Sequence, residues 1–74
     1  MTGAELIALI ESIIQFLQTT GLLAQLEAWI AALIAQIGGG TSLQGAFIGT
    51  LPVLVKSIPE GQRAAFLALL PKVV

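Results

Sequence analysis

The 74-residue sequence contains no cysteine, no histidine and no tyrosine. Without cysteine, the chain forms neither a disulfide framework nor a thiolate metal site. The groups left for proton transfer or nucleophilic attack are hydroxyls, carboxylates and a few cations, and the four glutamates do not converge on one patch. The glycine run at 38–40 follows an expected helix rather than a strand and lacks the P-loop lysine. We therefore expect no enzyme activity and no cofactor, metal or small-molecule substrate.

Charged residues are also scarce, at 9% of the chain with a net charge of −1. Ordinary soluble domains contain about 25%. The only basic residues are Lys56, Arg63 and Lys72, so there is no basic patch. Because clustered lysine and arginine supply most of the affinity for nucleic acids, we expect no nucleic-acid partner.

Apolar residues, by contrast, are in excess. They make up 57% of the sequence, and the mean hydropathy is +1.01. A chain of this length buries only about 60% of the surface that its unfolded form exposes. One small core cannot hide this much apolar side chain, so the remainder must meet lipid, partner subunits or both.

The spacing of the apolar residues predicts an all-α fold and one domain, because they recur every three or four positions and no strand-like alternation occurs. We expect four short amphipathic helices in two antiparallel pairs, forming a small helical bundle over residues 3–18, 22–37, 42–56 and 58–70. Thr2 with Glu5, and Ser57 with Glu60, have capping-box spacing at the first and last helix starts. Pro52 predicts either a kink near Thr50 in the third helix or its division into two short helical pieces. The break at Gly38, Gly39 and Gly40 is expected to act as the hinge between the helical pairs.

The expected helix over residues 22–37 divides into a bulky face and a face of small and polar residues. The bulky face, expected to close onto the later helices, contains Leu22, Leu23, Leu26, Trp29, Ile30, Leu33, Ile34 and Ile37. The opposite face has alanine where a lone soluble helix would place charge. On the third helix, Gly45, Gly49 and Thr50 lie opposite the apolar side.

Small residues let another helix approach closely. The candidate subunit-packing face consists of Ala24, Ala28, Ala31, Ala35, Gly45 and Gly49. The last two have small-xxx-small spacing.

Two functions agree with this composition. The first is a non-enzymatic structural protein, a small hydrophobic helical subunit that self-associates into a homo-oligomer, filament or shell. The alternative is a membrane-associated small protein, such as a viral membrane component or a lipid-binding, bacteriocin-like peptide. The apolar stretches are too short or too interrupted for an independent membrane span, and no signal peptide is expected because Met1, Thr2 and Gly3 lack a basic region. The localisation stays open between a membrane and a particle.

Overall fold

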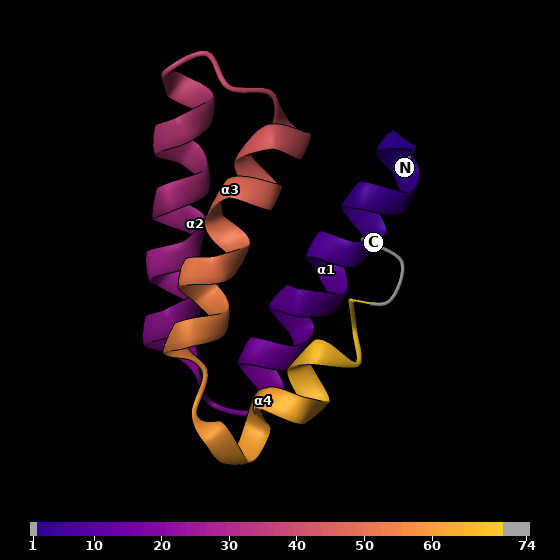
Figure 1. Cartoon of the computed structure of the whole chain (residues 1–74), viewed down its shortest axis with the longest axis vertical. Helices are drawn as coiled ribbons and strands as arrows, with labels where there is room; N and C mark the ends of the chain where they lie inside the picture. The colour runs from indigo at the N-terminus through magenta and orange to yellow at the C-terminus, as the bar shows by residue number, and fades with distance from the viewer. Residues whose placement is uncertain (1, 71–74) are drawn as a thin grey trace.

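The computed structural model describes residues 2–70, which form four α-helices and, within that range, no strand. They are α1 (Gly3–Thr19), α2 (Leu23–Gly38), α3 (Leu43–Ser57) and α4 (Glu60–Leu67), and neighbouring helices along the chain pack on one another (Figure 1). The predicted all-α, four-helix fold is confirmed.

The start of α1 follows from the predicted capping pair. The Glu5 amide donates to Thr2 Oγ1 at 3.1 Å, and the same hydroxyl lies 3.3 Å from Glu5 Oε1. This contact satisfies one of the amides that a helix N-terminus leaves without a partner.

Two glycines in the left-handed region end the first two helices. Gly21 has φ 76°, and the Leu22 amide donates across the turn to the Leu17 carbonyl at 2.8 Å. Gly40 has φ 98°, and the Thr41 amide donates to the Gln36 carbonyl at 3.0 Å. Both are Schellman motifs, in which the amide two residues beyond the C-cap residue donates to the carbonyl five residues earlier. This hydrogen bond requires an intervening residue that tolerates positive φ.

The most extensive helix–helix contact joins α2 and α3, across the turn of three glycines. In Figure 1 these helices lie side by side, whereas α1 is close to α2 near their shared turn and diverges from it towards the N-terminus. A tilted pair of rings, Phe16 and Phe66, joins α1 to α4, with centroids 5.6 Å apart and an angle of 55° between the ring planes. The hinge role of Gly38, Gly39 and Gly40 stays a prediction.

The core lies where the four helices meet. Its side chains are almost entirely aliphatic or aromatic, and Trp29 packs edge-on against Phe47 with ring centroids 6.0 Å apart. The buried hydrophobic residues are Leu6, Leu9, Ile13, Leu17, Leu26, Trp29, Leu33, Ala46, Phe47, Leu54, Ile58 and Phe66.

The fourth helix is shorter than predicted, and its predicted capping box is wrong. Ile58 is extended, with ψ 130°, because a residue before proline avoids the helical region. Ser57 therefore ends α3, and its hydroxyl donates back to the Leu54 carbonyl at 2.7 Å instead of capping α4. Pro59 is the N-cap, and after Leu67 the chain continues in a turn.

Helix α3 runs without interruption through Pro52, so the alternative of two short helical pieces is wrong. The proline has no amide hydrogen to donate to the Ile48 carbonyl, so one helical bond is missing there. The kink expected from that loss stays a prediction.

The glycine turns generate a stability prediction. Gly21→Ala and Gly40→Ala should each lower the free energy of unfolding by about 1–2 kcal/mol, because a side chain disfavours positive φ. Gly61→Ala is the matched control, since Gly61 lies inside α4 with open space at its Cβ position. Chemical denaturation should show that this control keeps or raises stability, by up to about 1 kcal/mol. Equal losses in all three variants would contradict the role of the two turns.

Candidate interaction surfaces

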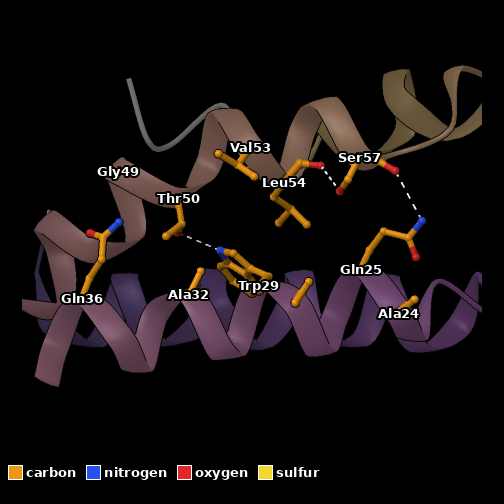
Figure 2. A pocket seen from close by; sticks show the side chains of 11 residues that line it. Ala24, Gln25, Trp29, Ala32, Gln36, Gly49, Thr50, Val53, Leu54 and Ser57 are labelled. Atoms are coloured by element: carbon orange, nitrogen blue, oxygen red, sulfur yellow. Dashed lines mark hydrogen bonds between the residues drawn. The ribbon is translucent and has the colours of Figure 1, made fainter.

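A shallow apolar groove runs along the seam between α2 and α3 (Figure 2). Its volume is about 330 Å³, and no charged side chain lines it. The lining residues are Ala24, Gln25, Ala28, Trp29, Ala32, Gln36, Gly49, Thr50, Val53, Leu54 and Ser57. The groove exists because α2 has alanine and α3 has glycine where larger side chains would close the seam.

A buried hydrogen bond fixes the two helices beneath this groove. The Trp29 Nε1–H donates to Thr50 Oγ1 at 2.9 Å (Figure 2). The Thr50 hydroxyl donates in turn to the Ala46 carbonyl at 2.8 Å. Thr50 is 3% exposed, so its assignment to the polar side of the helix was wrong. A hydroxyl whose hydrogen-bonding groups are satisfied can be buried at little cost.

Polar side chains close the groove at its two ends. Gln25 Nε2 donates to the Ser57 carbonyl at 3.4 Å, at the end near the N-terminus of α2. At the other end, Gln36 lies over Gly49, where an added Cβ would stand 3.1 Å from Gln36 Oε1. Gly49 thus allows the glutamine side chain to lie against the α3 backbone.

The six residues of the candidate subunit-packing face are all exposed. The structure brings three of them together in the groove: Ala24, Ala28 and Gly49. Ala31, Ala35 and Gly45 lie outside it. Gly45 is next to its own helix start, since an added Cβ would be 3.2 Å from the capping Ser42 Oγ. Whether these residues contact another subunit stays a prediction.

A second apolar surface was missed from the sequence. Four branched residues from the bulky face of α2 are exposed to solvent: Leu23 (54%), Ile30 (36%), Ile34 (65%) and Ile37 (44%). They recur after seven, four and three residues, so they form one line on the helix surface, here called the α2 stripe. The expectation that the whole bulky face closes onto the bundle is wrong for these residues.

The divergence of α1 explains part of this exposure. The first helix covers α2 near the turn at Gly21 but leans away beside the C-terminal half of α2 (Figure 1). Ile34 and Ile37 lie in that half, and Ile7 in the N-terminal half of α1 is likewise 51% exposed. The sequence contains one signal that could have identified the stripe. On a helical wheel, its four residues occupy only one edge of the bulky face.

The described helices provide little for other types of site. Residues 2–70 contain no group of three or more acidic, histidine or cysteine side chains that could hold a metal ion. In the same range, no helix is both long enough and apolar enough to cross a bilayer. The expected absence of enzyme activity stays a prediction.

Comparisons with protein-family models, with curated proteins and with solved structures found no match for this chain. Its function must therefore be argued from its own surfaces.

The buried hydrogen bond below the groove generates the second prediction. Thr50→Val should lower the free energy of unfolding by about 1–3 kcal/mol, because the Trp29 indole N–H would stay buried without an acceptor. Thr19→Val, at an exposed position, is the matched control and should change stability by less than about 0.5 kcal/mol. Denaturant unfolding followed by the single tryptophan measures both; equal effects would contradict the structural role of this bond.

Proposed function

We propose that the protein is a non-enzymatic structural subunit that self-associates into an oligomer, filament or shell. The observation that supports this most is the number of large aliphatic side chains exposed on so small a domain. They are Ile7, Leu23, Ile30, Ile34, Ile37, Leu43, Ile48, Val53 and Leu67. Single exposed hydrophobic residues are ordinary, but a line of four on one helix is typical of a contact surface.

Burial of these side chains would favour association. Each of these side chains is between 36% and 69% exposed. Removing the exposed remainder from water is worth roughly 1 kcal/mol per residue, since full burial of such a side chain is worth about 1.5–3 kcal/mol. Association costs an estimated 4–15 kcal/mol in lost freedom. Four stripe residues from each of two copies would contribute roughly 8 kcal/mol, which lies within that range.

An assembly larger than a dimer needs two distinct contact surfaces on each subunit, because a single two-fold contact closes at two copies. The α2 stripe is one. The candidate face of small residues is the second, and Ala24, Ala28 and Gly49 open it into a groove wide enough to admit side chains of a neighbouring subunit. Neither surface contains a charged residue of its own, and Glu27 is the one charged residue of α2 that lies beside the stripe.

The alternative is a membrane-associated protein that lies on a lipid surface. The same α2 stripe favours it, since an exposed aliphatic line is also what interfacial helices insert between lipid tails. Such helices usually have lysine and arginine on the polar face to meet anionic headgroups, and α1 and α2 have none. Self-association is therefore the preferred proposal.

Substitutions on the small-residue face test it. Ala28→Glu and Ala31→Glu should reduce assembly, because each would place a charge in the proposed contact. Both positions are exposed in the single chain, so stability of the subunit should change by less than about 0.5 kcal/mol. Ala8→Glu, at an exposed alanine of α1, is the matched control and should assemble like the parent protein.

Sedimentation velocity over a range of micromolar concentrations, without detergent, measures the outcome. A compact monomer at every concentration would overturn the proposed function. Normal assembly of both variants would mean that the alanine face is exposed to solvent in the assembly. Only the α2 stripe would then remain as a proposed subunit contact.

A further inference from the structure

The α2 stripe has a symmetry of its own. Leu23 and Ile37 lie seven residues before and seven residues after Ile30. A two-fold axis through Ile30, perpendicular to the helix, therefore places Leu23 of one copy opposite Ile37 of a second copy. A contact between two identical surfaces requires this kind of self-complementarity.

The ends of α2 also differ from those of the other helices. It has no side-chain cap at its N-terminus, no acidic residue in its first turn and no basic residue in its last turn. Each of the other three helices has at least one of these features: Thr2 and Glu5 on α1, Ser42 and Lys56 on α3, and Glu60 on α4. The partial charges at the two ends of α2 thus lack compensation from its own side chains.

Because the proposed function is self-association, we infer that α2 packs antiparallel against α2 of a second copy, with the two-fold axis at Ile30. In this arrangement the positive N-terminal end of each helix lies beside the negative C-terminal end of the other, so the two ends are complementary in charge. In this register Ile30 meets its own counterpart and Leu23 faces Ile37, while Ile34, the fourth stripe residue, lies at the level of Leu26 of the second copy.

The one charged residue beside the stripe is compatible with this pairing. Glu27 lies three residues before Ile30, so the axis separates the two copies of Glu27 by about 9 Å along the helices at 1.5 Å per residue. That is close to the screening length of about 10 Å at 0.1 M salt. The remainder of α2 after Glu27 has no charged residue, so each carboxylate meets no like charge at closer range.

Introduced thiols test the register directly, because the chain has no cysteine of its own. Disulfides require Cα atoms about 4.4–6.8 Å apart. Ile30→Cys should form a disulfide-linked dimer under mild oxidation, since this position meets itself on the axis. Leu23→Cys and Ile37→Cys should each stay unlinked alone, with their thiols about 21 Å apart along the helices, and should link when the two variants are mixed.

Affinity measurements form the second arm. Ile34→Glu should raise the dissociation constant of the dimer about 100-fold. Each buried glutamate is expected to weaken binding about tenfold, and a symmetric contact contains the substitution twice. Glu27→Leu should lower the dissociation constant, because it removes the charge beside the stripe. A variant that merely unfolded would not associate more tightly. Ala8→Glu, at an exposed position of α1 outside both proposed contact surfaces, is the matched control and should associate normally. Circular dichroism checks that each variant keeps its helices.

The outcomes separate this contact from the broader proposal. If the protein associates but Ile30→Cys does not link and Ile34→Glu has no effect, the antiparallel α2 contact is overturned and self-association stands. If the protein is monomeric at all concentrations, both fail. If it is monomeric alone but floats with phosphatidylcholine vesicles, and Ile34→Glu abolishes flotation, then the stripe meets lipid and the inference of a second copy is wrong.

Discussion

The close approach of α2 and α3 is the constraint on which the rest of the molecule depends. It is held by the hydrogen bond from the Trp29 indole to Thr50, beneath a seam lined by alanine and glycine. Trp29 also packs against Phe47, so one side chain joins the polar and apolar parts of the contact. Small residues bring the helices near enough for the bond, and they leave the groove above it.

As a result, α2 and α3 contact each other more extensively than α1 contacts α2 or α4 contacts α3. The first helix contributes buried residues along its whole length, from Leu6 to Leu17, and contacts α4 through Phe16 and Phe66, while its N-terminal part diverges from α2. A small bundle closed in this way covers only part of each amphipathic face. Several exposed aliphatic residues of α1 and α2 lie where the two helices diverge, and they are the reason that we propose a role in assembly.

The sequence predicts the helices well because their signals are local. Periodicity locates α1 to α3, the Thr2–Glu5 pair starts α1, and Gly21 ends it. The signal fails at Ser57, where the constraint that Pro59 places on Ile58 overrides a capping pattern. It fails more seriously for the bulky face of α2, since Leu26 and Leu33 are buried while Ile34 is not. Which part of a helix face is covered depends on the angle at which its neighbours cross, and local spacing does not encode that angle.

The position of Trp29 has a spectroscopic consequence. It is the only indole in the chain, it is 3% exposed, and it lies below the seam with α3, whereas the α2 stripe occupies a different edge of the same helix. Its emission therefore reports the polarity inside one subunit. The proposed contact through the stripe would leave that environment intact, whereas occupation of the groove, which Trp29 lines, would change it, so the intrinsic fluorescence of the protein distinguishes the two proposed contact surfaces.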